Sequence, residues 1–315
     1  MSLIRIYVPS YSYYEASLFR EEQVLLSMAE GIRKSGQDVK VIEGFDDVQP
    51  CDVAVIGGWD KLRYQRVIES QKAVGARTLV VKKGYIQPNR DFKVGDYYSV
   101  GWDGLNGDAD FCNENSPPDR WEKLGIELKP WRSSGEHVIL TCQVPTDGNV
   151  AGTDIIRWCE ERAIALKGLT KRPIVFRPHP LAKDVTPDIP GARRSEAPLL
   201  RDLENAWAVV TYNSASSSLA VIDGIPIFAN NKKSMAWAVA NKDINDIENP
   251  QMPDRRQWAA NLAYTQWTKD EIASGEAWVH IRRGAPIQVW RASTERAFKI
   301  TTRIDEITKI GDSQL

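Results

Sequence analysis

Small hydroxylated and amide residues gather in one segment, directly after a strongly apolar run. Residues 208–211 (Ala-Val-Val-Thr) are followed by Tyr-Asn-Ser-Ala-Ser-Ser-Ser at 212–218 and then by an apolar helical pattern. A strand that runs through such a turn into a helix start offers unpaired backbone N–H groups and the positive end of the helix dipole. Phosphate binds at such turns, whereas a helix cap would need only one of these side chains. The side chains expected to hold phosphate are those of Asn213, Ser214, Ser216 and Ser217.

A histidine held between two prolines follows another apolar run, because residues 174–176 (Ile-Val-Phe) lead into Arg177-Pro178-His179-Pro180. Proline fixes the backbone, and a rigid histidine can donate a hydrogen bond to a phosphate or leaving-group oxygen. Arg177 can pair with phosphate, although a surface salt bridge is an equal alternative. The serine segment begins 35 residues after His179, on the strand that we expect to be adjacent. His179 and Arg177 therefore join the predicted phosphate site.

A third polar loop, residues 143–149 (Gln-Val-Pro-Thr-Asp-Gly-Asn), also follows a predicted strand. Gln143 and Asp147 are its candidate contacts to a bound sugar, while the same composition also suits a plain turn.

The elements that must position these loops alternate between strands and helices in two halves of the chain. Continuous apolar runs such as residues 53–56 (Val-Ala-Val-Ile) are typical of buried parallel strands. The pattern predicts an α/β protein with two Rossmann-like domains, residues 1–130 and 131–285, followed by a C-terminal helix over 286–315 that returns to the first domain. Ligands of such sheets bind at the carboxyl ends of the strands, which is where all three loops lie.

Composition excludes several classes of protein. The 315 residues include 41 Lys and Arg against 42 Asp and Glu, so a small basic DNA-coating protein is excluded. The N-terminal segment is not a signal peptide, and no apolar run is long enough to span a bilayer. The four cysteines match no zinc spacing and there are only three histidines, so we expect reduced thiols, no metal site and a cytoplasmic protein.

Three motifs in order resemble the second domain of capsule-polysaccharide-type glycosyltransferases: residues 143–149, 177–180 and 209–229. The His-Pro and serine motifs are also similar to those of bacterial sialyl- and Kdo-transferases and of teichoic-acid glycerophosphotransferases. The resemblance implies the GT-B fold, in which two Rossmann-like domains face a cleft. It implies a nucleotide-sugar co-substrate on the second domain, an acceptor on the first, and no metal or other cofactor. The residues that inherit contacts to the donor's phosphate are His179, Ser214, Ser216 and Ser217.

The sequence departs from that family in the helix after the serines. The family often has a glutamate there that can hold the ribose, whereas this chain has Leu219 and Ala220.

Glycosyl transfer needs a carboxylate near the acceptor, and we expect it on the first domain. Asp60 is the first choice, because Gly57 and Gly58 would let a substrate approach the backbone; Glu15 and Asp103 are the others. A rival signal is the pair Asp108 and Asp110, which has the Asp-X-Asp form that holds a metal in GT-A enzymes.

The acceptor domain carries a basic stretch, since residues 61–93 contain nine Lys and Arg against two Asp and Glu. Such a face favours a polyanion, either duplex DNA or an acidic glycan. The hydroxymethyl group of a modified pyrimidine in phage DNA is slightly preferred, which would place the enzyme in the host cytoplasm; a capsular or surface glycan is the alternative. A sugar-nucleotide epimerase or a non-catalytic sensor of the same fold stays open. The expected acceptor-binding residues are Trp59, Lys61, Arg63, Lys82 and Lys83.

Overall fold

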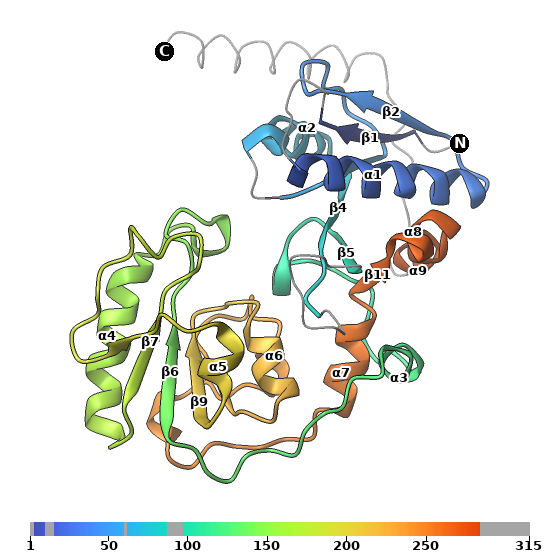
Figure 1. Cartoon of the computed structure of the whole chain (residues 1–315). Helices are drawn as coiled ribbons and strands as arrows, with labels where there is room; N and C mark the ends of the chain where they lie inside the picture. The colour runs from blue at the N-terminus through green and yellow to red at the C-terminus, as the bar shows by residue number, and fades with distance from the viewer. Residues whose placement is uncertain (1–2, 10–15, 60–61, 87–96, 284–315) are drawn as a thin grey trace, which may run out of the picture.

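The computed structural model describes residues 3–9, 16–59, 62–86 and 97–283 of the chain, which form two α/β domains (Figure 1). The first domain holds a six-stranded sheet in the order β11-β5-β4-β3-β1-β2, and the second a five-stranded sheet in the order β10-β9-β6-β7-β8. Both sheets have helices on their two faces, as expected for parallel strands joined by crossover helices.

In the first sheet four strands are parallel, and β5 runs antiparallel to β4. Strand residues alternate between two cores. Val53 and Val55 face helix α1, while Ala54 and Ile56 face helix α2. Burial on both faces explains the continuous apolar run in β3. The elements are β1 (Ile4–Val8), α1 (Ala16–Lys34), β2 (Val39–Glu43), β3 (Val53–Ile56), α2 (Gln65–Val74), β4 (Arg77–Lys83) and β5 (Tyr97–Trp102).

The second sheet is parallel throughout, and its strand order reverses direction between β6 and β9. In open α/β sheets this reversal marks the ligand crevice. Strands β7 and β9 are not adjacent, because β6 lies between them, so the expected adjacency of the His179 and serine loops is wrong. The elements are β6 (His137–Thr141), α4 (Ile155–Leu169), β7 (Ile174–Arg177), β8 (Arg193–Arg194), α5 (Leu199–Leu203), β9 (Ala206–Thr211), α6 (Ser217–Ile222) and β10 (Ile227–Ala229).

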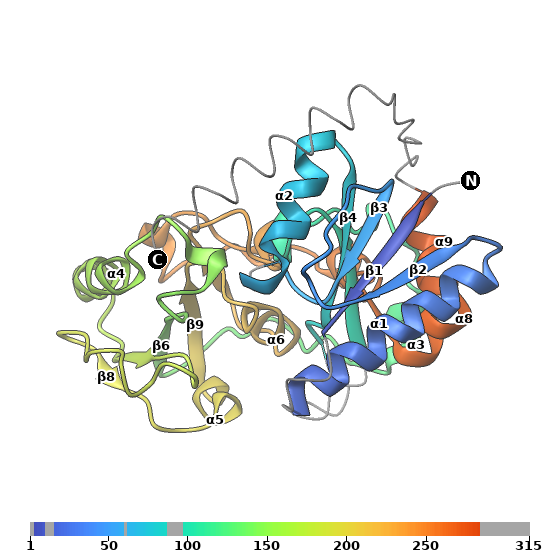
Figure 2. The ribbon, with the colours of Figure 1, turned by 90° about the horizontal axis from the view of Figure 1, so that it is seen from above.

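The chain returns to the first domain earlier than the boundary at 285. Strand β11 (Gln266–Thr268) pairs with β5, so it belongs to the first sheet. Helices α8 (Lys269–Ser274) and α9 (Glu276–Arg283) lie beside α1 in both views (Figures 1 and 2) and share its core through Ile272 and Trp278. The returning helix expected at 286–315 lies outside the described residues.

The connecting helices α3 (Asp119–Leu124) and α7 (Arg256–Ala263) pack on each other between the domains. One apolar cluster joins the domains, because Tyr85 and Phe111 from the first pack with Leu219 and Trp258 from the second. This shared cluster brings the carboxyl ends of the two sheets together. Within the described part of the chain, every helix is too short or too polar to cross a membrane.

Candidate functional site

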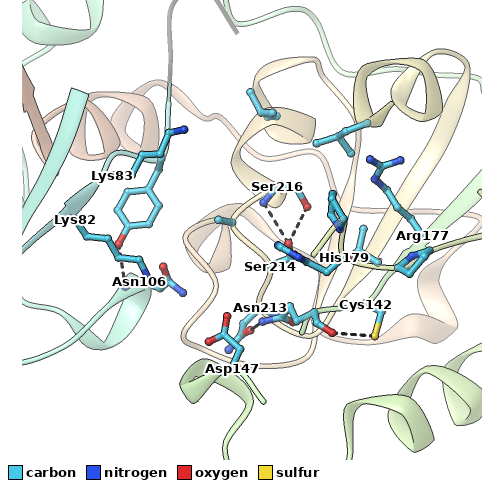
Figure 3. Close-up of a pocket in the computed structure, with 18 of the residues that line it drawn as sticks. Lys82, Lys83, Asn106, Cys142, Asp147, Arg177, His179, Asn213, Ser214 and Ser216 are labelled. Atoms are coloured by element: carbon cyan, nitrogen blue, oxygen red, sulfur yellow. Dashed lines mark hydrogen bonds between the residues drawn. The ribbon is translucent and has the colours of Figure 1, made fainter. Parts of the chain in front are cut away.

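A cavity of about 400 Å³ lies between the domains, at the reversal point of the second sheet. Figure 3 shows its two walls, with Lys82, Lys83 and Asn106 from the first domain facing the second-domain loops. The second-domain wall combines the three loops singled out from the sequence. Its predicted members are Gln143, Asp147, Arg177, His179, Asn213, Ser214 and Ser216.

Arg177 is held at the end of β7 by a buried ion pair. Its Nη1 donates to Asp202 at 2.5 Å and to the carbonyl oxygen of Ala197 at 2.6 Å. The Arg177 side chain is 13% exposed and that of Asp202 7%, so the pair is buried rather than a surface salt bridge. Ser195 Oγ donates to the same carboxylate at 2.6 Å. Asp202, which sequence reasoning missed, thus positions the arginine in the cavity wall.

His179 presents its Nε2 side to the cavity. The backbone N–H of Leu181 donates to Nδ1 at 3.2 Å, so the neutral ring carries its proton on Nε2. Burial lowers the pKa of His179 below its usual 6.5, and Arg177 lowers it further, while Asp147 acts in the opposite direction. Among the described residues no other group bonds to Nε2. The ring is therefore a neutral N–H donor near pH 7 that gains a positive charge on acidification.

Ser214 and Ser216 place their hydroxyls together in the cavity, 2.9 Å apart (Figure 3). Ser216 stands at the N-cap of α6 but makes no side-chain capping bond, so the reading of these serines as simple caps fails for it. Ser217 lies behind the wall instead. It is fully buried, its hydroxyl contacts that of Ser234 at 3.2 Å, and it does not line the cavity. The structure thus brings two of the three predicted serines to the site.

Gln143 and Asn213 join the ends of β6 and β9 at the reversal point. The Gln143 amide donates to the Asn213 side chain, and Asn213 N donates back to Gln143 Oε1 at 3.4 Å. Both are buried, so these side chains chiefly fix the two loops relative to each other. Asp147 follows in the first loop, and it is the only carboxylate among the described residues that line this cavity.

The first-domain wall contains Asn106, which sequence reasoning did not select. The Asn106 N–H donates to the Tyr85 hydroxyl at 3.0 Å, which ties the loop after β5 to the end of β4. Asn106 has a φ of 51°, a conformation that asparagine tolerates better than most residues. The Asn106-Gly107 dipeptide, a turn signal, is the pattern that could have found it.

Of the three predicted catalytic acids only Asp103 lies among the described residues, and it does not line this cavity. Asp103 pairs with Arg77 at 2.6 Å, accepts a bond from the Thr78 N–H at 2.7 Å, and lines a different cavity. Asp60, Glu15 and Lys61 lie outside the described residues. The reason given for Asp60 fails at Gly57: a Cβ there would lie 2.4 Å from Glu21 Cγ, so this glycine makes room for that buried side chain and not for a substrate.

Two predicted acceptor contacts are accounted for differently. Arg63 pairs with the buried Glu21 at 2.9 Å, and Tyr64 donates to the same carboxylate at 2.5 Å. The positive charge of Arg63 is therefore compensated by Glu21 inside the first domain. Trp59 does not line the main cavity; it lines the second cavity, together with Asp103. Trp102 is completely buried, and its indole N–H donates to the Ile281 carbonyl at 3.0 Å, so it is a core residue.

The Asp-X-Asp pair is divided between two cations. Asp108 pairs with Lys233 at 2.6 Å, and Asp110 pairs with Arg77 at 3.1 Å. Burial favours protonation of Asp110, but the Cys112 N–H and Arg77 outweigh it and keep its pKa below the usual range. No group of three or more His, Cys, Asp or Glu side chains within the described ranges is arranged to hold a metal ion. Nothing here favours the GT-A reading, and metal independence stays a prediction.

Comparisons with known proteins give a fold but no family. No protein-family model matches the sequence, and no curated protein matches it. The β-Kdo 2,4-transferase KpsC of Thermosulfurimonas dismutans matches with a TM-score of 0.55 and 13% identity, covering 81% of this chain and 89% of that one. The β-Kdo 2,7-transferase KpsC of the same organism covers 89% and 99% at 13% identity, with a TM-score of 0.47.

A UDP-GlcNAc 2-epimerase of Methanocaldococcus jannaschii also matches, at 10% identity over 82% of this chain and 97% of that one, with a TM-score of 0.32. Only the first of the three likenesses is close enough to carry an argument, and at such low identity it concerns the fold. The chain therefore has the GT-B arrangement of two Rossmann-like domains facing a cleft, as expected from its motifs.

Proposed function

We propose that this protein is a glycosyltransferase that moves a sugar from a nucleotide-sugar to a hydroxyl acceptor. The observation that carries the proposal is the interdomain cavity of about 400 Å³ in which His179, Ser214, Ser216 and Arg177 face Lys82 and Lys83. The neutral donors His179, Ser214 and Ser216 and the Arg177 guanidinium on one wall, with ammonium groups on the other, suit a ligand that carries phosphate.

The phosphate of the donor is bound, in this proposal, by His179 Nε2 and by the hydroxyls of Ser214 and Ser216. During transfer the bond from the anomeric carbon to the phosphate oxygen breaks, and negative charge develops on that oxygen. Fixed hydrogen-bond donors that face a developing charge lower the barrier, because they need no reorganisation. Lys82 and Lys83 reinforce this effect only when the two domains are closed, since they come from the opposite wall.

Asp147 is the carboxylate that we assign to the anomeric centre. The predicted acid Asp103 faces another cavity, whereas Asp147 lines this one together with His179. A carboxylate beside the sugar stabilises the positive charge of an oxocarbenium-like transition state. The acceptor oxygen forms the new bond to the anomeric carbon, and its proton leaves to a basic group or to water.

The preference for a DNA base as acceptor stays a prediction. The basic stretch that suggested a DNA acceptor includes Arg63 and Arg77, and both form ion pairs with carboxylates of the first domain. An epimerase stays the competing function, because it would use the same donor cavity.

The test is turnover of nucleotide-sugars by the full chain. UDP-, CMP-, CDP- and GDP-sugars are incubated with and without a mixture of glycans and hydroxymethylated duplex DNA, and free nucleotide and sugar products are quantified. Acceptor-dependent release of nucleotide, lost in His179→Ala, supports a transferase. Conversion of donor without acceptor identifies an epimerase, and binding without any turnover identifies a sensor; either result refutes the proposal.

A further inference from the structure

A second cavity, of about 270 Å³, lies between the domains beside the first. The first domain contributes Trp59, Gln65, Asp103 and Asp108, and the second contributes Lys233. Its volume is near the lower end of small-molecule sites. Of the three sequence motifs, only the one at residues 143–149 reaches it, through Gly148.

The two cavities share their dividing walls. Asn106 lines the first and Leu105 the second, while Asp147 lines the first and Gly148 the second. Consecutive Cα atoms are about 3.8 Å apart, so a ligand in the second cavity lies within one residue of the Asp147 loop. The second cavity is therefore next to the donor site, where an acceptor has to lie.

The lining chemistry combines one aromatic ring with polar groups on several sides. Trp59 is half-buried, with the Lys72 ammonium 5.2 Å from its ring centroid, and Gln65 Nε2 donates to the Trp59 carbonyl at 3.0 Å. An indole ring offers a broad apolar face together with a polar edge. Aliphatic C–H faces of a pyranose pack on such a ring, while its hydroxyls need donors and acceptors around the rim.

Those rim groups have the wrong charge for a polyanion. Asp103 and Asp108 keep 42% and 38% of their side chains exposed, although Arg77 and Lys233 pair with them. The lining side chains thus contribute two carboxylates and one ammonium. The lining ammonium, Lys233, is already paired with Asp108, so a phosphate or carboxylate would find no unpaired cation among the described lining side chains, whereas hydroxyl or ammonium groups would find acceptors.

We propose that the second cavity binds a neutral or amino-sugar ring of the acceptor, with Trp59 as its stacking surface. The inference rests on the proposed transferase function and adds the class of acceptor, which is a saccharide and not duplex DNA.

The test uses the labelled full chain on an array of neutral, amino-sugar and acidic oligosaccharides, and measures anisotropy with hydroxymethylated duplex DNA. The variants are Trp59→Ala, Trp59→Phe and the matched control Trp237→Ala, since Trp237 is another half-buried tryptophan beside a lysine and lines neither cavity. Nucleotide-induced thermal stabilisation is recorded for every variant as the check on folding and on the donor site.

The expected result is binding to neutral or amino-sugar spots that falls at least tenfold in Trp59→Ala, persists in part in Trp59→Phe, and is unchanged in Trp237→Ala. Nucleotide stabilisation should be the same in all four proteins. The inference is overturned if no glycan binds, if Trp59→Ala binds glycans as well as the wild type, or if only DNA and acidic glycans bind. If no nucleotide stabilises the wild type, the result refutes the donor site instead, whatever the glycan signal is.

Discussion

Gly107 forms a close backbone contact between the two domains beside the donor cavity, and enlarging it should open the cleft. Its N–H donates to the Lys233 carbonyl at 2.9 Å, next to the ion pair between Asp108 and Lys233. A Cβ at this position would lie 2.7 Å from the Lys232 carbonyl oxygen and 2.9 Å from Lys233 backbone carbons. Its φ is outside the left-handed region, so Gly107→Ala acts through this interdomain contact and not through local backbone strain.

The free-energy cost of Gly107→Ala follows from the close contact between the added methyl group and the backbone of Lys232 and Lys233. Inserting a methyl group against rigid backbone costs about 1–3 kcal/mol. If the substitution destabilises only the closed arrangement, the population of that arrangement falls by roughly 5- to 150-fold. The value of kcat/KM for transfer then falls by the same factor. Nucleotide affinity should change less, because His179, Ser214 and Ser216 all belong to the second domain.

The assay is acceptor-dependent nucleotide release, with small-angle scattering to detect the opened cleft. The matched control is Gly168→Ala in α4, where a Cβ meets nothing within 4 Å and the helix should gain up to about 1 kcal/mol. Transfer by Gly107→Ala within twofold of the wild type, at unchanged scattering, would refute the claim that this closed arrangement is the reacting one.

Three further predictions concern the donor cavity. Asp147→Asn should lower transfer by about 100- to 1,000-fold while the nucleotide dissociation constant, measured by calorimetry, stays within about threefold. Ser216→Ala should weaken nucleotide binding by roughly tenfold or more. Ser217→Ala should leave nucleotide affinity unchanged and lower the free energy of unfolding by about 1 kcal/mol, since the Ser217 hydroxyl contacts that of Ser234 behind the cavity wall. Equal effects of the two variants on nucleotide affinity would contradict the geometry. Because burial lowers the pKa of His179, nucleotide affinity should rise as pH falls below 6.5 through its folded-state pKa, and the free protein should lose stability over the same interval because the unfolded chain takes up that proton first. Calorimetry across this range should show no such component in His179→Gln.

The parts of the fold that could be predicted are those with strong local signals. Buried parallel strands such as β3 and β9 are continuous apolar runs, and the loops after β6, β7 and β9 meet because parallel strands end at one edge. Strand β5 has no comparable local signal, because its sequence, Tyr-Tyr-Ser-Val-Gly-Trp, contains a glycine and lies next to a turn-rich segment. Strand β11 has only three residues inside a segment that reads as helical, and it exists because β5 provides an edge to pair with.

Partners of charged side chains could not be predicted, because they depend on segments far apart in the chain. Arg177 reaches Asp202, and Arg63 reaches Glu21, across 25 and 42 positions. No local pattern marks either acid as the partner. Gly57 shows the same limit: a glycine that makes room for a buried side chain looks, in sequence, like one that makes room for a substrate.

The most direct measurement is thermal stabilisation of the full chain by UDP, CDP, CMP and GDP, without added metal, for wild type, His179→Ala and Leu181→Ala. Leu181 is the matched control, since its side chain is 87% exposed and only its backbone N–H contacts His179. One nucleotide at about 100 times its dissociation constant should add roughly 2.7 kcal/mol to wild type and to Leu181→Ala, and far less to His179→Ala. No stabilisation by any nucleotide, or equal stabilisation of His179→Ala, would contradict the assignment of the cavity as a donor phosphate site.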